Sequence, residues 1–190
     1  MRRTAHQGTT ANRGPDPCPL PNEFVALRQA IASQHRAVLT WYIGTGCRRG
    51  ETQALDWADV DLLGARARLW ADTTKAGKSR VVMLPPTVVA ALAALGQRAG
   101  PVFGNVDVRK AWQTACRVAA IKMRGVHDLR HAWASWHYAI HRDLLALKAA
   151  GGWASVGQVE RYAHIMPAGH EAAIRALWGL AEVRPQRKRA

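Results

Sequence analysis

The sequence has few cysteines and no long apolar segment, and each shortage excludes a class of protein. Its three cysteines stand at positions 18, 47 and 116, without any Cys-x-x-Cys spacing. An odd number of widely spaced thiols argues against a disulfide framework and indicates reduced cysteines. No apolar run approaches the roughly 20 residues that a membrane-spanning helix needs, and Met1-Arg2-Arg3 is not followed by the apolar core of a signal peptide. We therefore expect a cytoplasmic protein without a membrane partner.

Acidic residues are scarce as well. The 190 residues include 13 Asp and Glu against 27 Lys and Arg, which gives a formal net charge of +14. Such an excess favours a polyanionic partner, because each neutralised phosphate releases condensed counterions. Nucleic acid is the first candidate, and an anionic membrane surface is the alternative. Hydrophobic residues make up 48% of the chain, so we expect one globular domain with a core of its own.

The apolar periodicity predicts a mainly α domain with a small antiparallel β-sheet (α+β). Residues 1–17 have no periodicity and are expected to form a flexible lead-in, and residues 183–190 a basic tail. Basic and apolar residues alternate over 65–70, and residues 80–84 are rich in β-branched side chains, so we expect a hairpin with its turn at 75–78. Asp107 and Asp143 are expected as helix N-caps, and Ser155 with Gln158 as a capping box. Helical spacing predicts helices near 21–31, 37–43, 48–55, 87–96, 107–120, 127–141, 143–150, 156–165 and 170–181.

The first motif follows the second predicted helix and runs from Thr45 to Glu51. Gly46 permits a backbone turn that other residues resist, which can aim the next side chains across a cleft. Arg48 and Arg49 are adjacent, so on a helix they project about 100° apart and cannot share one target. Taken alone, the pattern is equally compatible with solvated arginines on a basic surface.

The second motif places His127, Arg130 and His131 at the start of a predicted helix. The spacing i, i+3, i+4 puts them on one face, near free N–H groups that favour a phosphate. A zinc site is the rival, but the Glu of a His-Glu-x-x-His motif and further ligands are missing. A packed histidine pair is the remaining structural alternative.

The third motif begins at Gly151-Gly152-Trp153 and ends with Arg161-Tyr162 and His164. Alone, Trp153 is compatible with simple packing, and Tyr162 with a half-buried core position. Taken together and in this order, the three motifs and Lys75-Ala76-Gly77-Lys78 of the hairpin turn resemble the phage integrase family of tyrosine recombinases. The resemblance extends over about residues 20 to 180.

This resemblance implies the DNA breaking-rejoining catalytic fold over residues 18–182, with site-specific DNA recombination through a 3′-phosphotyrosyl intermediate. Tyr162 would be the nucleophile, His127 the candidate base and Lys75 the acid for the leaving oxygen, while the arginines would hold the scissile phosphate. The implied partners are double-stranded DNA and further copies of the chain, as a tetramer on paired sites, with no cofactor. The implied catalytic residues are Arg48, Lys75, His127, Arg130, Trp153 and Tyr162.

Two departures from the family pattern bear on activity. Many relatives have His at the position of Trp153, and an indole offers one N–H donor but no acid-base function. Relatives also place a helical DNA-binding domain before the catalytic one, so we expect this chain alone to bind DNA weakly and with strong salt dependence. The alternatives are a truncated, non-catalytic DNA-binding remnant of an integrase and, ranked lower, a type IB topoisomerase.

Overall fold

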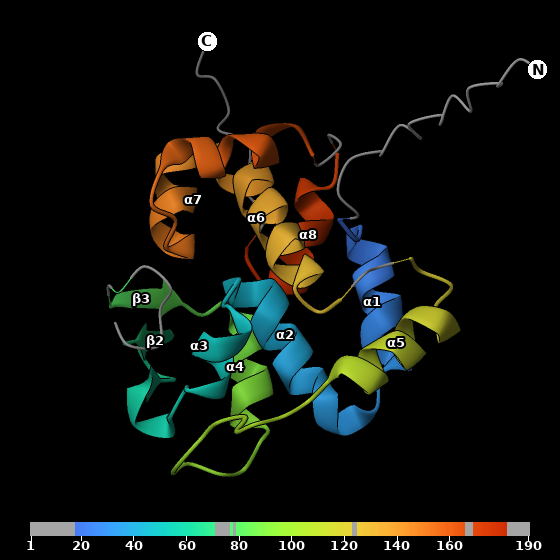
Figure 1. Ribbon diagram of the computed structural model, residues 1–190, viewed down its shortest axis with the longest axis vertical. Coiled ribbons are helices and arrows are strands. Elements are labelled where there is room, and N and C mark those ends of the chain that lie inside the picture. Colours follow the sequence, from blue (N-terminus) through green and yellow to red (C-terminus); the bar gives the residue numbers. More distant parts are fainter. Residues whose placement is uncertain (1–17, 71–76, 78, 123–124, 166–168, 182–190) are drawn as a thin grey trace, which may run out of the picture.

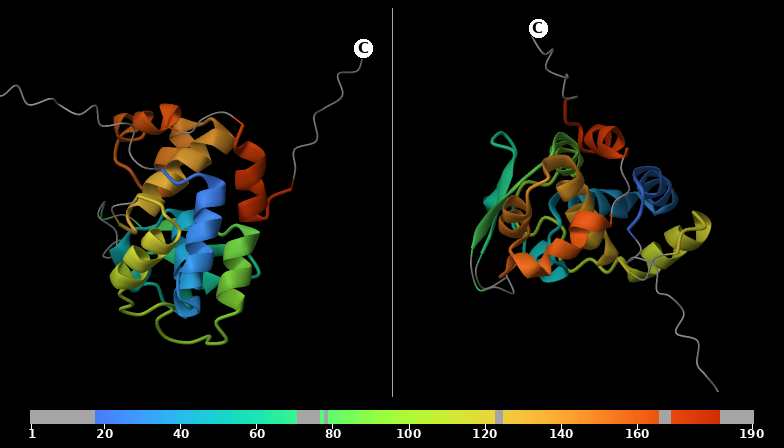
Figure 2. Two further views of the ribbon diagram at one scale, coloured as in Figure 1. Left: turned by 90° about the vertical axis from the view of Figure 1, so that its right-hand side faces the viewer. Right: turned by 90° about the horizontal axis from the view of Figure 1, so that it is seen from above.

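The computed structural model describes residues 18–70, 77, 79–122, 125–165 and 169–181. The expected lead-in (1–17), the expected tail (183–190) and Lys75 lie outside these ranges. Within them, α-helices surround a buried α2 and a small sheet lies at one side of the helical body (Figures 1 and 2). The predicted fold class is therefore confirmed. No helix among the described residues is long and apolar enough to cross a membrane.

The first helices enclose the core. They are α1 (Pro21–Ala30), α2 (Arg36–Thr45) and α3 (Arg49–Gln53). Every side of α2 from Val38 to Thr45 is buried, because α4 (Pro86–Ala93) and α6 (Asp128–His141) pack against it. Trp41 within it is fully buried and donates its indole N–H to the Thr52 hydroxyl at 3.1 Å, so the ring enters the core without an unpaired donor.

The sheet contains the expected hairpin and one strand that the sequence did not indicate. Strand β2 (Arg66–Leu69) pairs antiparallel with β3 (Arg80–Met83), and the short β1 (Val60–Asp61) pairs with the other edge of β2. Ala67 and Leu69 are buried, whereas Arg66 and Arg68 are exposed. The alternation in the sequence thus assigns the two faces of the sheet correctly.

The C-terminal half contains α5 (Arg109–Val118), α6, α7 (Leu144–Gly151) and α8 (Glu171–Trp178). Asp143 caps α7 as predicted, accepting from the backbone N–H groups of Leu145 and Ala146. The N-cap of α5 is Val108 rather than Asp107, whose carboxylate accepts from the N–H of Arg109 instead.

The prediction of one helix over 156–165 is wrong. Two short 3-10 helices stand there, Val156–Gln158 and Glu160–His164, which Figure 1 leaves unlabelled. Ser155 makes no capping bond, and Gln158 accepts instead from the N–H of Ala154. The second of these 3-10 helices packs against α6.

Candidate active site

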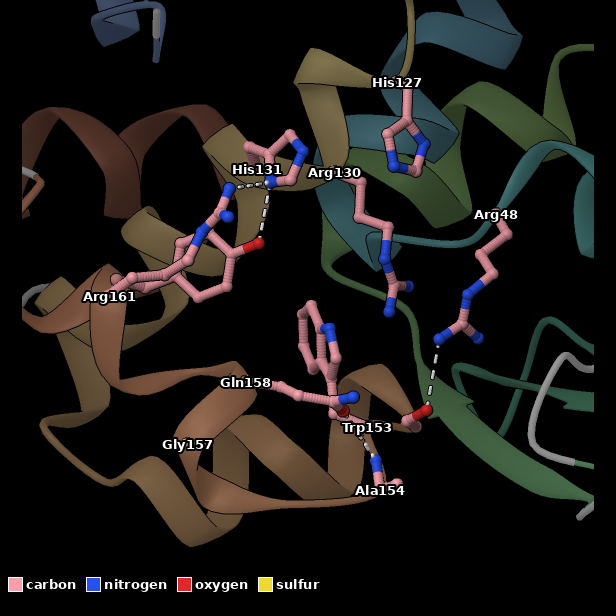
Figure 3. Close-up of a pocket in the computed structure, with 11 residues that line it drawn as sticks. Arg48, His127, Arg130, His131, Trp153, Ala154, Gly157, Gln158 and Arg161 are labelled. Carbon is pink, nitrogen blue, oxygen red and sulfur yellow. Dashed lines mark hydrogen bonds between the residues drawn. The ribbon is translucent and has the colours of Figure 1, made fainter. Parts of the chain in front are cut away.

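A cleft of about 660 Å³ lies where the start of α3, the start of α6 and the segment after α7 meet (Figure 3). Five of the six residues predicted from the sequence line it, although they come from positions 48 to 162 of the chain. The sixth, Lys75, is outside the described residues. The full lining is Arg48, His127, Arg130, His131, Gly152, Trp153, Ala154, Gly157, Gln158, Arg161 and Tyr162.

Arg48 reaches the cleft because the chain turns sharply at the end of α2. Gly46 caps that helix in the left-handed conformation, with φ of 64°, and a Cβ there would overlap the ring of Trp133. Only glycine fits both conditions. Arg48 is the N-cap of α3, and its guanidinium bonds Glu51 at 2.9 Å and the carbonyl oxygen of Gly152 at 3.2 Å. One edge of this guanidinium is thereby fixed while the side chain stays 21% exposed to the cleft.

Arg130 is buried, with 3% of its surface exposed. Its guanidinium donates to the carbonyl oxygens of Gly46 and Gly151 and lies over the Trp153 ring, 4.2 Å from the centroid. Burial, followed by repulsion from Arg48, lowers the pKa of Arg130 to about 10. The group stays protonated at neutral pH, and no carboxylate in the described part of the chain forms an ion pair with it, which suits an anionic ligand.

The two histidines of the second motif have different surroundings. His127 stands at the N-cap of α6. Partial burial of its imidazole, followed by repulsion from Arg130, lowers its pKa. A lowered pKa favours the neutral imidazole at neutral pH. His131 lies one turn further along α6, with the two ring centroids 5.2 Å apart.

Tyr162 stands on the second 3-10 helix with only 3% of its surface exposed. Its hydroxyl lies 2.7 Å from Nδ1 of His131, and both residues line the cleft. Its ring lies 5.7 Å from that of Trp153. The sequence led us to expect His127 as the base for the Tyr162 hydroxyl, whereas the structure places His131 next to this hydroxyl.

A third group also lies at this nitrogen of His131. The guanidinium of Arg161 lies 3.3 Å from the same Nδ1 atom, and a guanidinium can only donate. In the tautomer with its proton on Nε2, Nδ1 accepts from Arg161, and the Tyr162 hydroxyl then donates a hydrogen bond to the same atom.

The catalytic residues predicted from the sequence do not include four side chains that shape the cleft, namely Glu51, Arg80, His131 and Arg161. Each of them stands in or beside a motif, but only a contact with a residue far away in the sequence brings it to the cleft or to the groups that line it. The carboxylate of Glu51 is fully buried, a location that carboxylates adopt only when paired. Its place at the third position of α3 was a signal for a capping bond. No group of three or more metal-ligating side chains occurs among the described residues.

The sequence of this chain matches the family model described as the phage integrase family over residues 21–168. The chain belongs to this family. Among curated relatives, the integrase of Salmonella phage P22 is 28% identical over 167 residues, covering 77% of this chain and 43% of the phage protein. This family member thus spans less than half the length of that relative.

Solved structures show that the fold of this integrase-family chain is that of tyrosine recombinase catalytic domains. The XerA recombinase superposes with a TM-score of 0.68 at 23% identity, covering 90% of this chain and 66% of that one. The catalytic domain of bacteriophage HP1 integrase gives 0.65 at 21% identity, covering 84% and 94%. The XerH recombinase bound to its difH substrate gives 0.62 at 20% identity, covering 78% and 50%.

Proposed function

We propose that this chain cleaves and rejoins double-stranded DNA at specific sites through a covalent bond between Tyr162 and a 3′-phosphate. Membership of the phage integrase family supports site-specific recombination in general. The observation that carries the finer proposal is the cleft itself, in which a tyrosine hydroxyl bonded to a histidine opens onto the same space as two guanidinium groups.

The charges around the cleft suit a phosphodiester. The carboxylate of Glu51 pairs with Arg48 and Arg80, and Arg130 lies near them, so these four residues together carry a net charge of +2. A phosphodiester carries one negative charge, and the five-coordinate transition state at phosphorus carries two. The site therefore stabilises the transition state more than the ground state, which is the condition for catalysis.

The proposed cleavage step begins at Tyr162. Its oxygen attacks phosphorus while its proton passes to Nδ1 of His131, the atom that already accepts the hydroxyl. The bond from phosphorus to the 5′-oxygen breaks, and this oxygen takes a proton from Lys75, as the family resemblance implies. His127 and Trp153 would donate to non-bridging oxygens beside Arg48 and Arg130.

Rejoining reverses the same steps. A 5′-hydroxyl attacks phosphorus and gives its proton back to Lys75, the bond from phosphorus to the Tyr162 oxygen breaks, and this oxygen takes its proton back from His131. No bond energy is lost, because one ester replaces another. The partner in this proposal is duplex DNA held by copies of the chain as a tetramer on paired sites, in the cytoplasm. The DNA-bound XerH structure supports a DNA partner.

The test is covalent capture of DNA. The chain is incubated with a library of nicked duplexes that carry a random segment, then denatured, and the DNA that stays attached is sequenced. Peptide mapping should find the nucleotide on Tyr162, and Tyr162→Phe should form no adduct. Tyr138→Phe is the matched control, because Tyr138 is a second partly buried tyrosine, on α6 and outside the cleft.

The other outcomes distinguish the alternatives. An adduct with enriched sequences supports a site-specific recombinase. An adduct without sequence preference, with relaxation of supercoiled plasmid, would assign a topoisomerase. DNA binding without any adduct would leave a non-catalytic DNA-binding protein, and an adduct retained by Tyr162→Phe would refute the role of this tyrosine.

A further inference from the structure

The end of α7 is held by arginines from three other elements. The last carbonyl groups of a helix have no partner within it and favour cations. Here three consecutive carbonyl oxygens each accept from a different guanidinium. The pairs are Ala150 with Arg80 at 3.3 Å, Gly151 with Arg130 at 2.7 Å and Gly152 with Arg48 at 3.2 Å.

The buried carboxylate of Glu51 links two of these arginines. Its Oε1 accepts from Nη1 of Arg48 at 2.9 Å and from Nη1 of Arg80 at 2.7 Å. Its Oε2 accepts from the backbone N–H of Arg48 at 2.7 Å and from Nη2 of Arg80 at 2.8 Å. Four bonds use the full acceptor capacity of a carboxylate. Burial by itself would raise the pKa of Glu51, but the bonds from Arg80 and Arg48 outweigh it and hold the pKa below its usual value.

Arg80 does not line the cleft. Its side chain is 11% exposed, and each of its three guanidinium nitrogens donates within the protein, two to Glu51 and one to Ala150. A guanidinium engaged in this way has little capacity left for DNA. Its effect on the cleft therefore passes through the groups that it holds.

We propose that Arg80 is a positioning residue for the arginine pair at the scissile phosphate, an inference that rests on the proposed function. Arg80 occupies one acceptor position on each oxygen of Glu51, so the carboxylate neither neutralises Arg48 completely nor draws it out of the cleft. Its bond to Ala150 also fixes the end of α7, whose next two carbonyls orient Arg130 and Arg48. A guanidinium is required, because an ammonium cannot bridge both carboxylate oxygens in this fork geometry.

The experiment compares Arg80→Lys with Arg66→Lys. Arg66 is the matched control, since it lies on the neighbouring strand and pairs with a carboxylate, that of Asp61 at 3.0 Å, on the exposed face. The first readout is the NMR signal of the Arg48 guanidinium N–H groups, which does not depend on catalysis. In the wild type and in Arg66→Lys these groups should rotate slowly and exchange slowly, and in Arg80→Lys both processes should become fast.

The second readout is the single-turnover rate of adduct formation at saturating DNA. Arg80→Lys should lower this rate about 10- to 100-fold, the usual effect of misplacing a reacting group by an ångström or less, while the Kd for DNA changes less than about threefold. Combined with Arg48→Ala, it should cause no further loss, because residues that act as a unit are not additive. Arg66→Lys should leave the rate unchanged.

The outcomes separate this inference from the proposed function. A wild type that forms no adduct refutes the function, and the NMR readout then decides the positioning role alone. Unchanged Arg48 signals, or an adduct rate that survives Arg80→Lys, would overturn the inference. If Arg80→Lys does not fold, Glu51→Leu with Arg80→Met removes the buried charges together, and the same two readouts apply with the same expected losses.

Discussion

Replacing Arg130 by lysine tests whether a buried guanidinium is the main charge at the phosphate. The substitution keeps one positive charge but removes the fork that bonds the carbonyls of Gly46 and Gly151. A compact ammonium cannot contact both carbonyls and a phosphate oxygen at once. Loss of one such donor to a transition state costs about 10²- to 10³-fold in rate, so we expect Arg130→Lys to form adduct at that reduced rate.

The structure also predicts how this defect depends on pH. The site lowers the pKa of Arg130 to about 10, which disfavours the charged form by about 3 kcal/mol. The same penalty would bring a lysine from its usual pKa of about 10.4 to about 8. Between pH 7 and pH 9 the charged fraction of that lysine would then fall about tenfold, whereas Arg130 would stay charged.

The assay is single-turnover adduct formation at saturating DNA, measured at pH 7, 8 and 9 for both proteins. The ratio of the variant rate to the wild-type rate removes the pH dependence of the tyrosine nucleophile. This ratio should fall about tenfold from pH 7 to pH 9. A ratio that is constant with pH, or a variant within about threefold of the wild type at pH 7, would refute the reasoning.

Three further predictions follow from the same structure and from the family resemblance. His131→Phe keeps an aromatic ring at this position but removes the nitrogen that accepts the Tyr162 proton, so the adduct rate should fall about 10²- to 10⁴-fold. A much smaller loss would favour His127 as the base. Lys75→Ala should cleave normal DNA poorly but cleave well a substrate with sulfur in place of the leaving 5′-oxygen, and equal defects on both would reduce Lys75 to a phosphate contact. Burial, followed by repulsion from His141, lowers the pKa of His137 in the folded protein to about 4. As the pH falls below about 6.5, the imidazole of His137 therefore becomes protonated in the unfolded chain while it is still neutral in the folded protein. The contribution of His137 to the free energy of unfolding is therefore complete above that pH, and about 2 kcal/mol of it is lost at pH 5. Urea unfolding at pH 7 and pH 5 should show this loss in the wild type but not in His137→Phe. An equal loss in both proteins would contradict the assignment.

Local sequence patterns predicted most of the helices and both faces of the hairpin. The apolar stretch from Ala37 to Ile43 ends at Gly44-Thr45-Gly46, and the structure shows a buried helix there with a left-handed cap at Gly46. Asp143 caps its helix as expected. These features depend on the periodicity and backbone preferences of adjacent residues, so they can be predicted without knowledge of the fold.

The segment from 156 to 165 shows where such reasoning fails. Its composition is compatible with an α-helix, but Tyr162 and Val159 are buried against other elements and the chain takes up two 3-10 turns. Tertiary packing overrides local propensity in a segment this short. The partner of the Tyr162 hydroxyl depends on this packing, because a different helical register would turn the ring away from His131.

The sequence by itself determined the class of the fold, indicated a polyanionic partner through its charge, and supplied five cleft residues whose motifs resemble the phage integrase family. Only the tertiary structure decided which groups act together. Glu51 and Arg80 are 29 residues apart, and Arg48 and Gly152 are 104 residues apart, and no local pattern encodes such contacts. The physical reason is that a buried charge is stable only when it is paired or hydrogen-bonded, and folding decides which groups lie close enough to do so. In this protein, the arginines of three elements meet the carbonyl groups at the end of α7.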